Sequence, residues 1–168
     1  VGTFLRFLRA RNTVVDPTPN PYESSLTGRR GAPVPAVAAI FDRLPPLVQR
    51  MAEAKGLAQN QAEIERNARS FRTMLGLVKA MHDAGIPLVA GSDTPAGLTY
   101  QRELELYEVA GIPLLDILHI ATLGAARVAG LDSELGSIAP GKRADLLPVE
   151  GDPARGMSAL RRTSLVMR

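Results

Sequence analysis

The longest regular pattern of apolar positions runs between residues 60 and 85 and predicts one amphipathic helix. Side chains recur along it at steps of four and three residues, as one face of a helix requires: Ile64, Ala68, Phe71, Leu75, Val78 and His82. Asn60 is placed to cap the helix start, with Glu63 three residues later to complete the cap. Gly85 occupies the usual position of a left-handed cap at the helix end.

A second pattern follows directly and predicts a buried strand that ends near an acid. Residues Ile86–Ala90 carry no charge, which is typical of a strand covered on both faces in a parallel sheet. The shorter run Asn12–Val15 predicts another strand, after a helix that ends near Arg11. Ligands bind beyond the carboxyl ends of strands in such sheets. Asp93 follows the 86–90 strand, so we expect it at the rim of a site.

Segments rich in proline, glycine and hydroxyl residues separate these units. The stretch from Asp16 to Pro35 has loop composition, and a loop this long in a compact domain is usually functional or mobile. A second loop is predicted from Pro95 to Thr99. Further helices are expected to open at Pro45-Pro46, to span Tyr100–Val109, to run from Gly111-Ile112-Pro113 to about Ile120, and to start at a Thr122 cap before Gly130.

From Leu135 onward, short apolar runs alternate with turns and predict a small β element. Residues 136–142 are expected to form a strand followed by a tight turn at Pro140-Gly141, and residues 144–149 and 164–167 two further strands. This change of pattern divides the chain into two parts. Residues 1–131 hold the strand–helix units with their long insertion, and residues 132–168 form part of an accessory β domain.

Composition narrows the class of protein. The 168 residues are 45% hydrophobic and 22% charged, as in a soluble globular domain, and no apolar run approaches the ~20 residues of a membrane span. The absence of cysteine removes disulfides and thiolate chemistry and fits a cytoplasmic protein. A net charge of +3 and 4% aromatic residues offer no stacking platform for nucleic acid. We therefore expect neither nucleic acid nor membrane as a partner.

Chain length limits the architecture. A closed (β/α)8 barrel needs about 250 residues, and only two strand–helix units are visible here. Two buried strands standing alone would leave apolar faces and unpaired edges in water. The sequence is therefore interpreted as an α/β fold, the last portion of a barrel followed by part of an accessory β domain. A companion segment or a homo-oligomer is expected to complete it.

Three motifs carry a resemblance to a known family. They are Ala90-Gly91-Ser92-Asp93-Thr94, the stretch Ala121–Leu131, and Leu135–Leu146 with its Gly-Ser-Ile-x-Pro-Gly-Lys-x-Ala-Asp-Leu core. At these motifs the chain resembles the amidohydrolase superfamily, and more narrowly its imidazolonepropionase- and prolidase-like metal-dependent hydrolases. The resemblance covers residues 71–168 well and the N-terminal third loosely.

The resemblance implies a fold and a reaction. It implies a TIM-like (β/α)8 barrel with a small β-sandwich, and hydrolysis of an amide or cyclic amide C–N bond in a small-molecule substrate by metal-activated water. Asp93 would be both a ligand of a divalent metal, commonly zinc, and the general base. A catalytic zinc normally has three protein ligands. The histidines, His82 and His119, both fall on predicted helices, so the other ligands must come from outside this chain.

Other interpretations remain open at this stage. Asp93 could instead cap a turn, and Tyr22, Glu23 and Arg102 are weaker candidates for substrate binding, because they lie on or just after rim loops. The chain alone is expected to be inactive or nearly so. The alternative to an enzyme is a non-catalytic remnant or interaction module that assembles with a partner chain.

Overall fold

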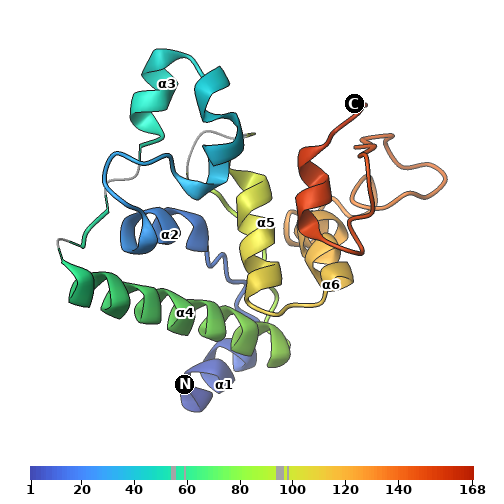
Figure 1. The fold of residues 1–168 in the computed structure, drawn as a ribbon. Coiled ribbons are helices and arrows are strands. Elements are labelled where there is room, and N and C mark those ends of the chain that lie inside the picture. Colours follow the sequence, from blue (N-terminus) through green and yellow to red (C-terminus); the bar gives the residue numbers. More distant parts are fainter. Residues whose placement is uncertain (54–55, 59, 94–96, 98) are drawn as a thin grey trace.

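The computed structural model describes residues 1–53, 56–58, 60–93, 97 and 99–168. Its helical elements, in chain order, are α1 (Gly2–Ala10), α2 (Pro19–Thr27), η1 (Pro35–Arg43), α3 (Pro46–Met51), α4 (Gln61–Asp83), α5 (Tyr100–Val109), α6 (Leu114–His119), η2 (Ile120–Gly124), α7 (Ala125–Val128) and η3 (Met157–Arg161). Figure 1 shows α5 at the centre, with α2 and α4 on one side and α6 and η3 on the other. None of these helices is both long and apolar enough to cross a membrane.

The long helix α4 forms where the apolar pattern predicts it. Its start is capped by the Asn60 side chain, which accepts a hydrogen bond of 3.0 Å from the Glu63 backbone N–H. Gly85, just past its end, has a φ of 69°, a left-handed conformation that glycine adopts without strain. The buried residues on α4 are Phe71, Leu75, Val78 and Met81. The predicted helix and both of its ends are confirmed.

The two apolar runs pair in parallel, as predicted, but only over a single bridge. Val15 donates its N–H to Pro87 O (3.0 Å) and accepts at its O from Val89 N–H (3.0 Å), which makes a parallel bridge between Val15 and Leu88. No strand longer than a single bridge occurs in the described residues. We refer to residues 12–15 and 86–90 as the two parallel segments.

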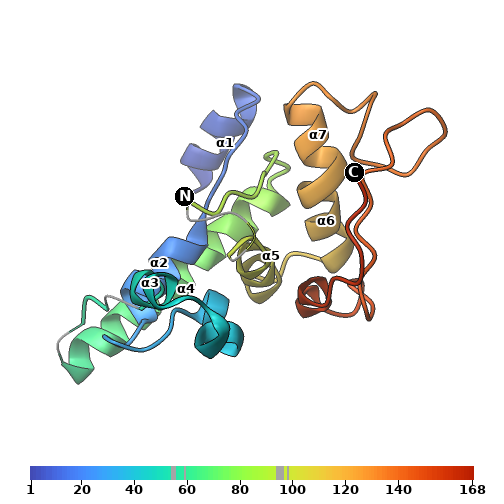
Figure 2. The ribbon, with the colours of Figure 1, turned by 90° about the horizontal axis from the view of Figure 1, so that it is seen from above.

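The prediction that both faces of the parallel segments are buried is wrong. Leu88 is 5% exposed and packs into the core, whereas Pro87 and Val14 face outward, Val14 with 39% of its area exposed. A groove of about 620 Å³ lies over this outer face and is bounded on its far side by α6, η2 and α7. Figure 2 shows α1 and α7 standing apart. The outer face is open because the described part of the chain supplies no layer to cover it.

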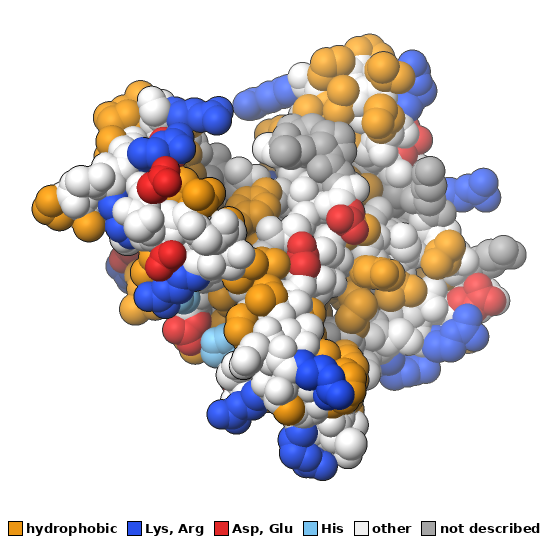
Figure 3. All heavy atoms as spheres, turned by 180° about the vertical axis from the view of Figure 1, so that it is seen from behind, with side chains coloured by type: hydrophobic (Ala, Val, Ile, Leu, Met, Phe, Trp, Pro, Cys, Tyr) orange, Lys and Arg blue, Asp and Glu red, His pale blue; other side chains and the backbone are white. Residues whose placement is uncertain are grey.

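Two apolar clusters hold the fold together, and α5 contributes to both; the smaller consists of Phe71, Leu75 and Leu106. The larger joins residues from α1, α4, the second parallel segment, α5, α6, η2, η3 and the turn after α5: Leu8, Val78, Met81, Ile86, Leu88, Leu104, Tyr107, Ile112, Ile117, Ile120 and Met157. Other large apolar side chains stay outside, and orange apolar patches are visible over the back face in Figure 3. Ile138, for example, is 90% exposed.

Part of the long loop predicted from Asp16 to Pro35 is helical. Pro19 and Pro21 lie in the first turn of α2, where the missing N–H groups of proline cost nothing because those groups have no partner in a helix. Its N-cap residue Thr18 has a φ of 38°. Contacts with α4 and α5 fix α2 in place, and composition alone does not reveal such contacts.

The helical stretch from α6 to α7 is continuous, which corrects the predicted new helix at Thr122. The Thr122 hydroxyl donates to Leu118 O (2.6 Å) instead of capping a helix start. The chain passes through a π-helical turn, η2, without leaving the helical conformation. Gly130, with a φ of 71°, ends the stretch as predicted.

Two of the three strands predicted in the C-terminal tail are represented only by isolated antiparallel bridges, and no regular strand forms there. Leu146 pairs with Met167 and Val149 with Thr163. The strand predicted at 136–139 is wrong, because these residues form bends and irregular chain. Here the Lys142 ammonium donates to Asp132 O (2.5 Å) and Ser137 Oγ (2.8 Å), which holds the segment as a loop. The domain boundary between residues 131 and 132 stays a prediction.

Candidate functional site

Two carboxylates lie at the carboxyl ends of the two parallel segments. Asp16 follows Val15 directly, and Asp93 lies three residues after Ala90. Both are exposed. Because the segments run parallel, their carboxyl ends meet at the same edge, and the sequence of each segment therefore brings one acid to this rim.

Asp16 connects the first segment to the second. Its Oδ1 accepts hydrogen bonds from the Thr18 hydroxyl (2.7 Å) and from the Gly91 backbone N–H (2.9 Å). A Cβ atom at position 91 would lie 2.2 Å from Asp16 Oδ2, far inside van der Waals contact. Gly91 therefore allows the carboxylate to approach the backbone. Sequence reasoning placed Asp16 only at the start of a loop and gave it no such role.

Gly91→Ala should consequently destabilise the protein. The added methyl group displaces the Asp16 carboxylate and removes its hydrogen bond to the backbone N–H, and the loss of one such bond typically costs about 1 kcal/mol. Urea denaturation measures the change in the free energy of unfolding. Gly76→Ala is the matched control, because its Cβ would meet nothing within 4 Å on the exposed face of α4. That control should stabilise by about 0.5–1 kcal/mol; equal effects of the two substitutions would contradict the argument.

Asp93 itself is placed at the rim with an unusual backbone. Its φ is 48°, a left-handed conformation that few residues other than glycine, asparagine and aspartate adopt. The side chain is exposed and not sealed in the interior. The predicted pocket loop from Pro95 to Thr99 and the neighbouring Thr94 lie largely outside the described residues, which resume with Gly97 and then Thr99.

A third carboxyl group, that of Glu103, lies beneath this rim and is completely buried. Its Oε2 accepts a hydrogen bond of 3.1 Å from the Asn20 N–H in the first turn of α2. Burial raises the pKa of Glu103 to about 8, with further upward contributions from the negative charges of Asp16 and Asp93. Sequence reasoning missed Glu103, although an acid among the buried positions of a helix is an available cue.

Two tyrosines surround Glu103. Burial raises the pKa of the Tyr107 hydroxyl, and the charge of Glu103 raises it further. The pKa of Tyr100 is raised for the same two reasons, burial first. The Tyr107 hydroxyl donates to Val89 O over 2.8 Å, so it also contacts the second parallel segment.

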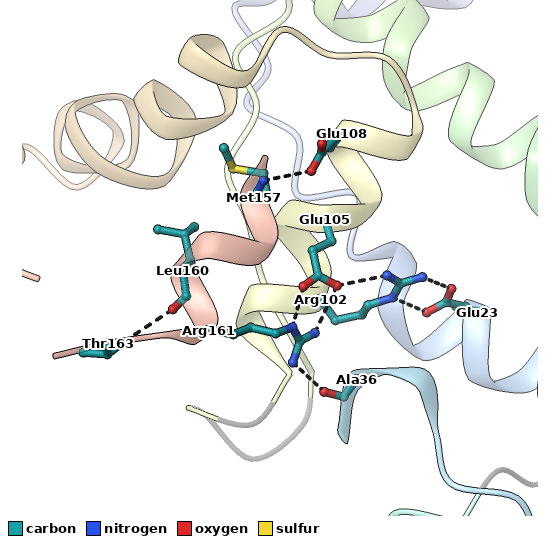
Figure 4. A network of polar contacts seen from close by, with 9 residues as sticks. All are labelled: Glu23, Ala36, Arg102, Glu105, Glu108, Met157, Leu160, Arg161 and Thr163. Carbon is teal, nitrogen blue, oxygen red and sulfur yellow. Dashed lines mark hydrogen bonds and ion pairs between the residues drawn. The ribbon is translucent and has the colours of Figure 1, made fainter. Parts of the chain in front are cut away.

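The weaker candidates for substrate binding occupy different environments. Arg102 and Glu23 bind each other through two hydrogen bonds of 2.8 and 2.5 Å, and Arg102 also donates to Glu105 (2.9 Å), as Figure 4 shows. Arg161 donates to both oxygens of the Glu105 carboxylate and shares Oε2 with Arg102. Tyr22 is 54% exposed. The Arg102 guanidinium and the Glu23 carboxylate thus have a structural role. A role of Tyr22, Glu23 or Arg102 in substrate binding stays a prediction.

The described residues do not assemble a metal centre by themselves. No three acidic or histidine side chains among them converge in a way that could hold an ion. His82 lies on α4 between Asp83 (3.3 Å) and Asp116 (3.1 Å), and His119 ends α6, so both histidines are helical as predicted. Asp93 can supply one carboxylate ligand, and a zinc site needs about three protein ligands.

Comparison with known proteins covers nearly the whole chain. A family model described as the amidohydrolase family matches residues 4–166. A Xaa-Pro dipeptidase crystal structure superposes on 98% of the chain with a TM-score of 0.66 and 20% identity, which establishes the shared fold, and the chain spans 35% of that protein.

Two curated relatives match parts of the sequence. A 5-methylthioadenosine/S-adenosylhomocysteine deaminase of Symbiobacterium thermophilum is 39% identical over 38% of this chain and 14% of its own length. An N-substituted formamide deformylase of Arthrobacter pascens is 36% identical over 45% of this chain and 16% of its own length. The chain thus spans only a minor part of either relative.

Proposed function

This chain belongs to the amidohydrolase family, and from that membership we propose that it is the C-terminal part of an enzyme that hydrolyses a carbon–nitrogen bond. The matched relatives are named as a deaminase and a deformylase, both of which act at such bonds. We propose a small-molecule amide or cyclic amide as the substrate class. The observation that carries the proposal is the match over residues 4–166, together with an acid at the end of each parallel segment.

We propose that residues 1–131 contribute the last strand–helix units of a TIM-like (β/α)8 barrel and that residues 132–168 contribute part of a β-sandwich. The parallel bridge between Val15 and Leu88 supports the first part, and the antiparallel bridges of Leu146 and Val149 support the second. The exposed Val14 and the open groove beside it are consistent with a surface that further barrel strands cover.

Asp93 is the proposed metal ligand and general base. Its rim position, exposure and left-handed backbone support this role, because strained backbone conformations cluster at functional sites. We propose that Asp93 binds a divalent metal ion, zinc by family resemblance, and that the other ligands of this ion come from outside this chain. When bound, such an ion lowers the pKa of water to about 7. Asp93 would accept a proton from the attacking water and return it to the leaving nitrogen.

The proposal predicts that the isolated chain is inactive. The described residues offer one metal ligand and not three. The isolated chain, assayed with N-formyl and dipeptide substrates and added zinc, should therefore hydrolyse them no faster than buffer without protein. The same chain produced together with its upstream coding sequence should hydrolyse one of these classes in a zinc-dependent way. Robust turnover by the 168-residue chain alone would refute the assignment of the missing ligands to another segment.

The alternative candidate is a non-catalytic module that assembles with a partner. The exposed apolar side chains and the lack of a metal-holding triad among the described residues favour it. In that case the complete protein would be inactive on every amide tested, and substitution of Asp93 would change nothing except stability.

A further inference from the structure

The ladder of backbone hydrogen bonds between the two parallel segments ends after one rung. Val15 makes that rung with its N–H, which donates to Pro87 O, and with its carbonyl, which accepts from the Val89 N–H. In a parallel pair the next rung falls two residues further along each segment, at Pro17, and would use Val89 O and the Gly91 N–H. Pro17 has no N–H to donate. Val89 O and the Gly91 N–H therefore need other partners.

Two side chains replace the missing rung. The Tyr107 hydroxyl donates to Val89 O over 2.8 Å, and Asp16 Oδ1 accepts from the Gly91 N–H over 2.9 Å. Both backbone groups that a non-proline residue at position 17 could have paired are thus bonded. Asp16 directly precedes Pro17, so the residue that ends the ladder stands beside the carboxylate that continues it.

The Asp16 carboxylate is held in this position from two sides. The Thr18 hydroxyl donates to the same Oδ1 over 2.7 Å. Its Oδ2 lies against the Gly91 backbone, where a Cβ atom would be only 2.2 Å away, so glycine alone leaves room for it. The Asp16 side chain is exposed, and core packing therefore does not account for the arrangement.

The bond to Gly91 lies where the chain leaves the second parallel segment and turns toward the rim. Asp93 follows two residues later with a φ of 48°. A left-handed conformation at a residue other than glycine persists only where the surrounding structure fixes it. The hydrogen bond to Asp16 ties the backbone just before this turn to the first parallel segment.

We propose that Asp16 is a positioning residue, whose carboxylate holds the Gly91 peptide and thereby sets the turn that presents Asp93 at the rim. In this role Asp16 acts through the backbone and needs no contact with the substrate. The consequence for catalysis rests on the proposed function of Asp93, whereas the effects on the Gly91 amide and on the Asp93 backbone do not.

The first test compares the unmodified full chain with Asp16→Ala and Asp16→Asn by NMR. Alanine removes the acceptor, so the Gly91 amide should exchange with deuterium about fivefold faster, the factor that corresponds to the loss of one hydrogen bond. The carbon-13 signal of the Asp93 Cα, which reports its backbone conformation, should shift. Asparagine keeps an oxygen acceptor and should leave both signals close to those of the unmodified chain.

Asp152→Ala is the matched control for this test. Asp152 Oδ1 also accepts a backbone N–H over 2.9 Å, that of Ala154, but in the C-terminal tail. Its loss should leave the signals of Gly91 and Asp93 unchanged.

Three results would overturn the proposal: an unchanged rate of Gly91 exchange in Asp16→Ala, an unchanged Asp93 signal in that variant, or equal effects of alanine and asparagine. Thr18→Val keeps the carboxylate, removes only the hydroxyl that orients it, and should shift the same two signals by less. If Asp16→Ala is too unstable to measure, unmoved signals in Thr18→Val decide against the proposal.

The second test uses the complete enzyme saturated with zinc. Asp16→Ala should lower kcat about tenfold or more with little change in KM, because a displaced base loses the reactive geometry while the other contacts to the substrate persist. Asp16→Asn should retain most of kcat, and Asp152→Ala all of it. Full kcat in a folded Asp16→Ala enzyme would overturn the catalytic consequence and leave the proposed hydrolysis standing. An inactive unmodified enzyme would instead overturn the proposed function, and the NMR comparison would still decide the positioning role.

Discussion

The substitution Asp93→Asn is expected to leave the fold intact and to reduce hydrolysis by the complete enzyme by about 10²–10⁴-fold, the typical contribution of a positioned general base. Asparagine has nearly the same volume as aspartate and tolerates the left-handed φ of 48° at this position. The substitution therefore removes the proton acceptor and the anionic ligand with little change in the backbone. The measurement is kcat/KM, accompanied by a melting curve that confirms folding.

A matched control separates the role of Asp93 from the loss of any surface charge. Asp42→Asn alters an exposed aspartate in η1 and should leave kcat/KM unchanged. A loss of zinc from the purified Asp93→Asn enzyme would identify the carboxylate as a ligand as well as a base. Full activity in a folded, zinc-loaded variant would remove Asp93 from the mechanism and leave the proposed reaction without its base.

The parts of this fold that could be predicted from sequence are those in which the determining contacts are local. The Asn60 cap lies three residues from its partner, and the end of α4 depends on the conformational freedom of one glycine. The bounds predicted for Tyr100–Val109 agree with those of α5. Helix periodicity and caps are read within a window of a few residues, and no distant contact overrides them here.

The elements that sequence reasoning missed depend on contacts between distant residues. Helix α2 forms in a segment of loop composition, and its first-turn Asn20 N–H is satisfied by Glu103, 83 residues away. The exposure of Val14 was missed for a related reason: a run of apolar residues predicts burial but cannot tell whether the covering layer belongs to the same chain.

The residues of the candidate site likewise divide into those set by local sequence and those set by distant contacts. Asp93 could be placed at a strand end from the apolar run and the motif that precede it. Asp16 gained a role only when the bridge between Val15 and Leu88 brought Gly91 beside it, 75 residues along the chain. Nothing in the local sequence of Glu103 links it to Asp16 or Asp93. Only the packing of α5 beneath the rim buries this acid near them.

Loss of the Arg102 side chain should cost about 3 kcal/mol of stability in Arg102→Ala, the lower end of the cost of breaking a buried ion pair. Its guanidinium binds Glu23 on α2 and Glu105 on α5, and Arg161 extends the network to η1 through Ala36 O (2.9 Å). Removal leaves the 7% exposed Glu23 as a buried, unpaired charge. Urea denaturation measures the loss.

The exposed Arg72→Ala on α4 serves as the control and should change stability by less than about 0.5 kcal/mol. A double-mutant cycle with Glu23→Gln tests the cause, because the second substitution should cost far less once Arg102 is gone. Additive losses would mean that the two side chains act separately. Coupled losses would show that this ion pair holds α2 against α5, and with it the Asn20 N–H against the Glu103 acid beneath the rim.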